Sequence, residues 1–159
     1  MEARKLLDIL NIAERLKDTS RHCYTRNGRR ESVAEHCWMA ALMAYFMRDE
    51  FPEVDMDKVI HMLILHDLGE AFTGDIPVFD KTAADEVREE ALLQAWVRSL
   101  PKEKAEEMLA LYEEMDARQT PEAKVYKALD GLEAVVQHNF SPISTWLPNE
   151  YDLNVTQGW

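Results

Sequence analysis

Four side chains of the sequence could together hold a metal ion. His36 stands in an apolar segment, His66 and Asp67 follow 30 residues later, and Asp130 belongs to a third apolar segment. Burying a carboxylate in an apolar segment destabilises the fold unless the carboxylate is paired, hydrogen-bonded or bound to a metal. Imidazole nitrogens and carboxylate oxygens suit borderline divalent ions such as Mn, Co, Fe or Zn. The set predicts a site for one divalent metal ion.

Each of these residues also has a structural explanation when it is taken alone. A lone histidine in a helix is more often a hydrogen-bonded core residue than a ligand, and His66-Asp67 is an ordinary dipeptide near a helix end. Asp130 could be the partner of an arginine such as Arg21. The metal is favoured because the members of the set fall on three different predicted helices, so that two imidazoles and two carboxylates can converge.

Helices are the elements that must position these residues. Apolar side chains recur at helical spacing along most of the chain, and Ser32 with Glu35 forms a capping-box pattern. Thr82 and Thr120 are further candidate N-caps. The pattern predicts six helices, which run over 2–18, 33–50, through 59–66, over 82–100, from 101 onward, and over 121–138.

The fold class that follows is all-α, a single helical bundle of five or six helices. We expect one domain over residues 1–159, with its core at about 6–138. Residues 69–81 are expected to form a loop, and the tail over 140–159 is expected to be loop-like because of its prolines. No β-hairpin signal is found.

The charge balance excludes some partners. The chain carries 18 Lys+Arg against 30 Asp+Glu, a formal net charge of −12. Long nucleic acids and anionic membranes need many basic contacts, so neither is expected as a partner. The segment 19–30 differs from the rest because it contains four arginines and no acid, namely Arg21, Arg26, Arg29 and Arg30.

Cysteine usage and hydropathy indicate a cytoplasmic location. The two cysteines, Cys23 and Cys37, form no CxxC pattern, so a disulfide framework is not indicated. The longest apolar run covers residues 37–47, well short of the roughly 20 residues that a membrane helix needs. The N-terminal segment lacks the apolar core of a signal peptide.

Three stretches carry a family resemblance: GRRESVAEHCWMAALMA, LILHDLGEAFTGDIP and TPEAKVYKALDGLEAVVQHN. Their order of H, then HD, then D resembles the HD-domain metal-dependent phosphohydrolases. The segments E-x-V-x-[ED]-H, here Glu31 to His36, and HD-x-x-E-x-x-x-GD, here His66 to Asp75, look like the 5'-deoxynucleotidase branch. The resemblance runs from about residue 6 to 138.

The resemblance implies roles for individual residues. It implies that Glu70 is the catalytic glutamate, although alone it would read as an acid at a helix end. Asp75 matches a second acid, associated with the sugar and the leaving group. The implied metal ligands are His36, His66, Asp67 and Asp130.

The arginine segment has an implied role and one departure. Arg21 matches an arginine that reaches the substrate. Bacterial deoxynucleotidases follow that arginine with tryptophan, whereas His22 follows here, so the sugar and base preference stay open. We also expect one further arginine of the segment to touch phosphate, without choosing among Arg26, Arg29 and Arg30.

The function predicted from the sequence is metal-dependent removal of the 5'-phosphate from (deoxy)nucleoside monophosphates by a metal-bound water. The cofactor is one divalent ion, which could be Mn, Co, Fe, Zn or Mg. One alternative is an HD-domain hydrolase of another phosphoester, such as a nucleoside triphosphate or a cyclic nucleotide. Another is a non-catalytic helical module stabilised by metal. The apolar second helix also permits a homodimer.

Overall fold

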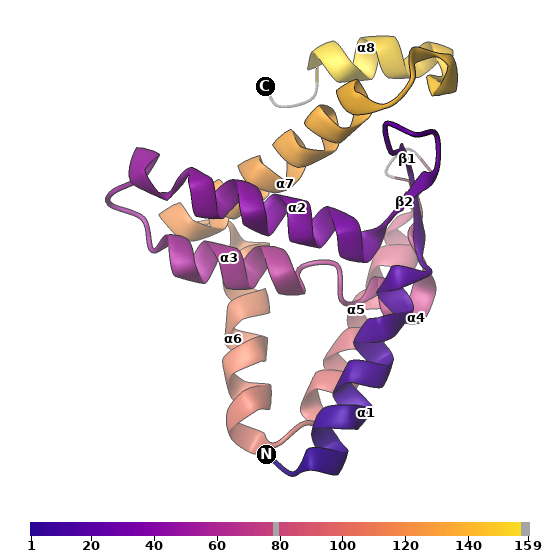
Figure 1. The fold of residues 1–159 in the computed structure, drawn as a ribbon. Helices are drawn as coiled ribbons and strands as arrows, with labels where there is room; N and C mark the ends of the chain where they lie inside the picture. The colour runs from indigo at the N-terminus through magenta and orange to yellow at the C-terminus, as the bar shows by residue number, and fades with distance from the viewer. Residues whose placement is uncertain (78–79, 157–159) are drawn as a thin grey trace.

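The structure is a computed structural model that describes residues 1–77 and 80–156. Its α-helices are α1 (Ala3–Ala13), α2 (Val33–Phe46), α3 (Met56–Leu65), α4 (Glu70–Thr73), α5 (Ala83–Arg98), α6 (Lys102–Ala117), α7 (Pro121–Phe140) and α8 (Pro148–Thr156). Two strands, β1 (Ser20–Tyr24) and β2 (Arg30–Ser32), and three 3-10 turns at Glu14–Lys17, Arg48–Glu50 and Ile143–Thr145 complete it. Figure 1 shows α2, α3 and α7 lying together, with α1, α5 and α6 extending from them. The all-α prediction is confirmed.

The six expected helices correspond to α1, α2, α3, α5, α6 and α7. Ser32 Oγ accepts the amide of Glu35 at the start of α2, and the Glu35 carboxylate accepts the Ser32 amide, so the capping box is confirmed. Thr82 and Thr120 cap α5 and α7 as expected. The first and second helices end earlier than predicted, because their last turns tighten into 3-10 geometry.

The main core lies between α2, α3 and α7. The fully buried side chains there include Ala40 from α2 and Val59, Met62 and Leu63 from α3. Leu129 of α7 closes the cluster. Because all three helices bury apolar side chains against one another, polar groups on their facing sides are held in fixed positions.

A second core fixes the residues that follow α3. Leu68 and Ala71 pack with Leu16, Val33 and Val97, which come from three other elements. The chain between α3 and α4 is therefore anchored by apolar contacts rather than left as a free loop. The loop expected over 69–81 contains the short helix α4, so that prediction was wrong over residues 70–73.

The structure contains a β-hairpin, although the sequence predicted none. Strands β1 and β2 pair antiparallel, with Ser20 opposite Ser32 and Tyr24 opposite Arg30. Gly28 has φ +79 in the connecting turn, a conformation that glycine adopts without strain. The strands are short and carry polar side chains, so they lack the apolar alternation that signals a half-buried strand.

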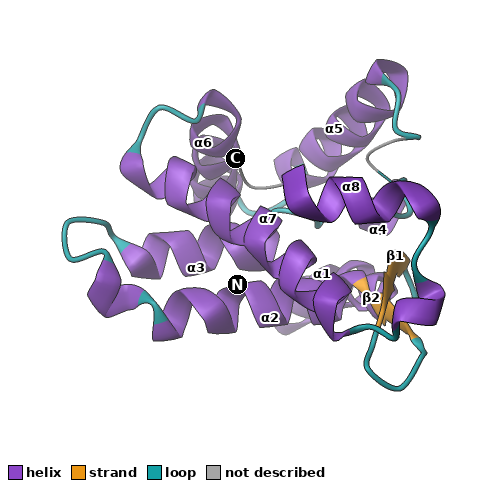
Figure 2. Ribbon diagram, turned by 90° about the horizontal axis from the view of Figure 1, so that it is seen from above, coloured by secondary structure: helices purple, strands orange, loops and turns teal. Residues whose placement is uncertain are grey.

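The C-terminal tail was expected to be loop-like over 140–159, and that prediction is wrong where α8 forms, while residues 157–159 lie outside the described residues. Helix α8 occupies residues 148–156. Figures 1 and 2 both place it near the hairpin, and Figure 2 shows that it turns back from the end of α7. Pro148 was taken as a helix breaker, but it stands at the first position of α8, where proline is tolerated.

In the part of the chain that the structure describes, no helix is both long and apolar enough to cross a membrane.

Candidate metal centre

Four side chains from three helical regions converge near the middle of the molecule. His36 comes from α2, His66 and Asp67 follow α3, and Asp130 comes from α7. The Nε2 atoms of His36 and His66 lie 3.2 Å apart. Asp130 Oδ1 is 3.0 Å from the first of these nitrogens and 3.2 Å from the second. Asp67 Oδ2 is 3.2 Å from His66 Nε2 and 3.7 Å from His36 Nε2. The structure thus brings together all four residues of the sequence-predicted set.

The hydrogen bonds of the two histidines leave both Nε2 atoms directed at this cluster. His66 Nδ1 donates to the carbonyl oxygen of Leu63 at 2.8 Å, and a carbonyl can only accept, so the ring proton sits on Nδ1. His36 Nδ1 contacts the Glu133 carboxylate. Two imidazole Nε2 atoms and two carboxylates therefore face the same point, and with the histidines neutral this donor set fits a divalent cation.

Glu133 was missed from the sequence. It is fully buried and lies one turn after Asp130 on the same face of α7. A glutamate in a helix ordinarily faces solvent, and only its three-residue spacing from Asp130 indicates the site. Through His36 Nδ1 it holds the ring orientation, as carboxylates behind ligating histidines do.

Electrostatics keep the two aspartates ionised. Burial acts to raise the pKa of Asp67, but the charge of His66 lowers it to about 2. Burial likewise opposes ionisation of Asp130, yet hydrogen bonds with His36 and His66 hold its pKa well below the usual range. Both carboxylates are therefore available as anionic donors at neutral pH.

Two further acids lie beside the cluster. Glu70, the first residue of α4, is 7 % exposed, and its Oε2 atom is buried without a hydrogen-bond partner among the described residues. Burial, with the charges of Asp67 and Asp75, raises the pKa of Glu70 to about 9. Burial also raises the pKa of Asp75. Both acids line one pocket of about 680 Å³ with Asp67 and Asp130.

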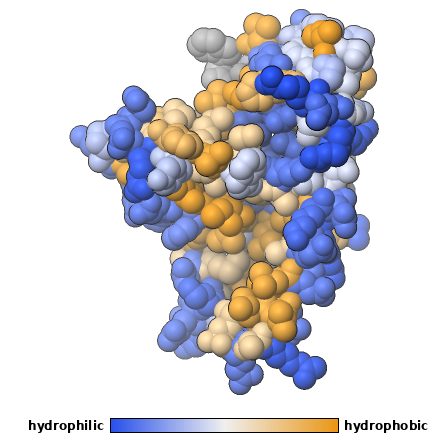
Figure 3. Space-filling model, viewed as in Figure 1, coloured by the Kyte–Doolittle hydropathy of each residue, from blue (hydrophilic) through white to orange (hydrophobic). Residues whose placement is uncertain are grey.

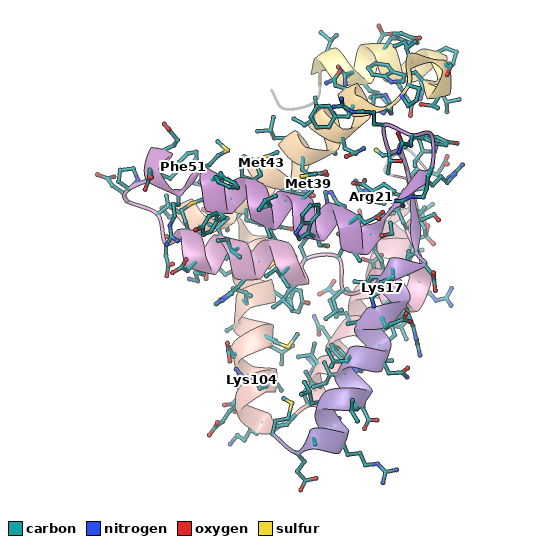
Figure 4. The ribbon with its side chains drawn as sticks, in the orientation of Figure 1. Lys17, Arg21, Met39, Met43, Phe51 and Lys104 are labelled. Carbon is teal, nitrogen blue, oxygen red and sulfur yellow. The ribbon has the colours of Figure 1, made fainter. Side chains whose placement is uncertain are left out.

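Arg21 of β1 lies in the same pocket, as the sequence suggested. Its Nη1 is 3.6 Å from Asp67 Oδ2 and its Nε is 3.3 Å from Glu31 Oε2. Figure 4 labels Arg21 where the hairpin meets the N-terminal end of α2, at the opposite end from Phe51. The unexpected hairpin is thus the element that directs this guanidinium at the acidic cluster.

The other arginines of the segment do not reach the pocket. The Arg26 guanidinium lies over the Phe140 ring, at 5.1 Å from its centroid, and Arg29 pairs with the exposed Glu35. Arg30 lies over the Tyr24 ring. The expectation that one of them contacts phosphate is not supported, because the turn of the hairpin directs them elsewhere. The basic residues that line the pocket are Arg21, Lys81, Arg118 and Lys127.

Comparison with known proteins agrees with this geometry. Residues 13–158 match the HD domain family. The human protein named 5'-deoxynucleotidase HDDC2 is 32 % identical over 139 residues, which are 85 % of this chain and 67 % of that protein. A crystal structure of a predicted metal-dependent phosphohydrolase from Magnetospirillum magnetotacticum has a TM-score of 0.75 at 32 % identity, covering 84 % of this chain and 69 % of that chain.

A more distant likeness concerns the fold alone. The cyanophage S-2L HD phosphohydrolase DatZ, bound to dA and one catalytic Zn²⁺ ion, has a TM-score of 0.58 at 23 % identity and covers 98 % of this chain and 79 % of that chain. Taken with the family match, the convergence of H, HD and D on one point settles the class of protein. This chain belongs to the HD-domain family. The resemblance to its 5'-deoxynucleotidase branch is confirmed by relatives of that name.

Proposed function

We propose that this chain is a metal-dependent phosphohydrolase that removes the 5'-phosphate from (deoxy)nucleoside monophosphates. The observation that carries the proposal is the cluster of His36, His66, Asp67 and Asp130. Its two aspartates line a pocket that is also lined by the guanidinium of Arg21 and by Glu70 and Asp75, two acids of raised pKa. The relatives named 5'-deoxynucleotidase support the substrate class.

The four clustered residues are the proposed metal ligands, and the ion is Mn, Co, Fe, Zn or Mg. When bound, such an ion polarises a phosphoryl oxygen and lowers the pKa of a water toward neutrality. His and carboxylate donors serve several ions, so the donor set leaves the metal open. Glu133 acts as a positioning residue, because it holds His36 with Nε2 directed at the cluster.

Arg21 is the proposed phosphate-binding residue. Its guanidinium lies beside Asp67 at 3.6 Å and is 15 % exposed, so it borders the cluster and still faces the pocket. A monophosphate carries about two negative charges at neutral pH, which one arginine and a divalent ion can balance. The guanidinium of Arg21 also stabilises the negative charge that develops on the phosphoryl group during the reaction.

Glu70 and Asp75 are the proposed proton carriers. Attack of water on phosphorus breaks the bond to the 5'-oxygen and yields phosphate and a nucleoside. In the metal-free fold the raised pKa keeps Glu70 protonated, and the charge of a bound divalent ion would lower that pKa. The ionised carboxylate of Glu70, whose buried Oε2 has no hydrogen-bond partner among the described residues, would then accept a proton from the attacking water. Asp75, whose pKa burial raises, donates a proton to the departing 5'-oxygen.

Phosphate release tests this function directly. The chain is stripped with a chelator, reloaded with each divalent ion, and given ribo- and deoxyribonucleoside monophosphates, dATP and cyclic AMP. We expect release from the monophosphates and its loss in the variant His66→Ala. His61→Ala is the matched control, because His61 is exposed on the same helix α3. Monophosphate hydrolysis by His66→Ala at the wild-type rate would contradict the assignment.

The same panel separates the alternatives. Faster release from dATP or from cyclic AMP would replace the monophosphate substrate with another phosphoester. Bound metal with metal-dependent melting, but without any turnover, would identify a non-catalytic module. Glu70 Oε2 is buried beside the proposed metal ligands without a hydrogen-bond partner among the described residues, which supports the enzyme, because a purely structural site gains nothing from an unsatisfied buried acid.

We also propose that the chain forms a homodimer, resides in the cytoplasm and makes up one HD domain over residues 1–159. Figure 3 shows apolar side chains gathered over α2, α3 and α1 on one face. Helix α2 carries the exposed aromatic residues Trp38 and Phe46, which are 60 % and 74 % exposed, and Tyr45, whose ring contacts that of Phe46. Large exposed aromatic patches mark interfaces, and light scattering of the purified chain tests the dimer. The net charge of −12 supports the absence of a long nucleic-acid partner.

A further inference from the structure

The pocket extends well beyond the four clustered residues, which we call the metal end. Along α7 its lining continues from Asp130 through Gly131 and Ala134 to His138. Eight residues of α-helix cover ~12 Å, about the length of a nucleoside 5'-monophosphate from phosphate to base. A phosphate held at the metal end therefore leaves its nucleoside beside the second half of α7.

The α7 wall leaves room for that nucleoside. A Cβ atom placed on Gly131 would meet nothing within 4 Å, so the space beside this turn of α7 is open. Ala134, one turn later, adds only a methyl group to the lining. Small residues alone do not make a binding site, so a polar group elsewhere in the lining must recognise the nucleoside.

Helix α8 contributes Leu153 and Asn154 to the lining of the same pocket. The Asn154 Nδ2 atom is buried and has no hydrogen-bond partner among the described residues. A buried amide donor without an acceptor loses its bonds to water and gains none in return. It lines the same pocket as the open wall at Gly131, so an acceptor on a ligand in this space would satisfy it.

Helix α8 is held against this end by several polar contacts. Glu150, buried in its first turn, lies with Oε1 at 3.0 Å from His22 Nε2 and with Oε2 at 3.8 Å from His138 Nε2. Trp146 stacks on the His138 ring with centroids 4.0 Å apart and donates from Nε1 to Ser141 Oγ. Because His22 stands next to Arg21, the tail is tied to the phosphate-binding strand.

We propose that the space between Gly131, Ala134 and His138 of α7 and Leu153 and Asn154 of α8 is a nucleoside-binding end, in which Asn154 Nδ2 donates a hydrogen bond to the base. This inference rests on the proposed function and names the specificity residue of the same pocket. Pyrimidine O2 and purine N3 are both acceptors on the same edge of their bases. Asn154 therefore distinguishes a nucleotide from an abasic sugar phosphate and does not distinguish one base from another.

The test compares dAMP and dCMP with 2-deoxyribose 5-phosphate as substrates. Asn154→Asp removes the donor and keeps the size of the side chain. We expect its kcat/KM to fall about tenfold for both nucleotides, mainly through KM, and to stay unchanged for the sugar phosphate. Asn139→Asp is the matched control, because Asn139 is exposed on α7 and donates to Val135 rather than into the pocket. Equal losses on all three substrates, or no loss on any, would overturn the proposal.

Binding of deoxyadenosine without phosphate separates this inference from the proposed function. Calorimetry on the metal-loaded chain should show about tenfold weaker binding to Asn154→Asp than to the wild type and to Asn139→Asp. If the wild type releases phosphate from no monophosphate, the proposed function fails, and the calorimetric comparison still decides the role of Asn154. Equal affinities of the wild type and Asn154→Asp would overturn that role.

Discussion

At the metal end of the pocket the polar side chains are held by partners from three helices, whereas the nucleoside-binding end is lined by small residues of α7 and by residues of the tail. His36 is fully buried, and both of its ring nitrogens have carboxylate neighbours. Asn154 lies in the last turn of α8, and its buried Nδ2 atom has no hydrogen-bond partner among the described residues. The first arrangement is typical of a pre-organised reaction centre, and the second is typical of a surface that a ligand completes when it binds.

Substitutions at the metal end should therefore reduce activity more than substitutions at the nucleoside-binding end. Loss of a group from the metal end leaves other buried charges without a counter-charge, which is expensive. Loss of a group from the nucleoside-binding end removes one hydrogen bond to a ligand, which costs much less. The predictions below test this contrast, beginning with the largest expected effect.

Replacing Asp130 by Asn should abolish turnover. The substitution removes the anionic oxygen that lies 3.0 Å from His36 and 3.2 Å from His66. We expect a loss in kcat of at least about a thousandfold, since a catalytic metal stabilises several kcal/mol of developing charge. Phosphate release and metal content by mass spectrometry measure it. Unchanged turnover in Asp130→Asn would show that the metal end is not the reaction centre.

Replacing Glu133 by Gln should weaken metal binding without removing a ligand. Gln keeps the size of the side chain but loses the charge that holds His36. Loss of such a partner typically costs 10–100-fold in metal affinity, and excess metal should restore most of the turnover. Titration of the stripped protein with Mn or Co measures the shift. Glu113→Gln, on the exposed face of α6, should bind like the wild type, and equal affinity of both variants would refute the role of Glu133.

Replacing Glu70 by Gln should stabilise the metal-free chain at alkaline pH. The pKa of Glu70 is raised to about 9 in the fold, so the folded state favours the protonated acid. The stabilisation of the fold by the protonated acid is complete below the ordinary pKa of glutamate and is lost as the pH rises toward 9. In chelator, urea unfolding at pH 8 should give Glu70→Gln a free energy of unfolding more than about 1 kcal/mol above the wild type, with little difference at pH 5. A constant difference across pH would contradict the shift.

Replacing Gly131 by Ala should have the smallest effect. Glycine within a helix costs about 1 kcal/mol relative to alanine, and a Cβ here meets nothing within 4 Å. We expect the free energy of unfolding of the chain without substrate to rise by about 0.5–1 kcal/mol. Urea unfolding measures the change. A destabilised Gly131→Ala would mean that the space beside α7 is not open.

The metal end could be predicted from the sequence because its residues stand out there. His36 and Asp130 are polar groups in apolar helices, and such placement has few explanations. Glu133 could not be recognised, since a glutamate on a long helix reads as a solvent-facing residue until its burial is known. Arg21 was identified through the family resemblance, but nothing in the sequence alone separated it from the arginines that turn away.

The nucleoside-binding end was much harder to predict, because it depends on the tail. Two prolines and scattered polar residues gave no helical pattern for α8. Its position comes from the contact of Glu150 with His22, far earlier in the chain, and from the contact of the preceding Trp146 with His138. The hairpin was missed for a similar reason, as its short polar strands carry no apolar pattern. Local periodicity predicted the long helices well, whereas these two elements are fixed by tertiary contacts.

Metal stoichiometry measured together with turnover tests the central claim most directly. Stripped wild-type protein is titrated with Mn or Co while phosphate release from a deoxynucleoside monophosphate is followed. Activity should rise from none and saturate at one ion per chain, and His36→Ala should gain neither ion nor activity. Full activity of the stripped protein, or restoration of His36→Ala by the same titration, would contradict a single metal held by these four residues.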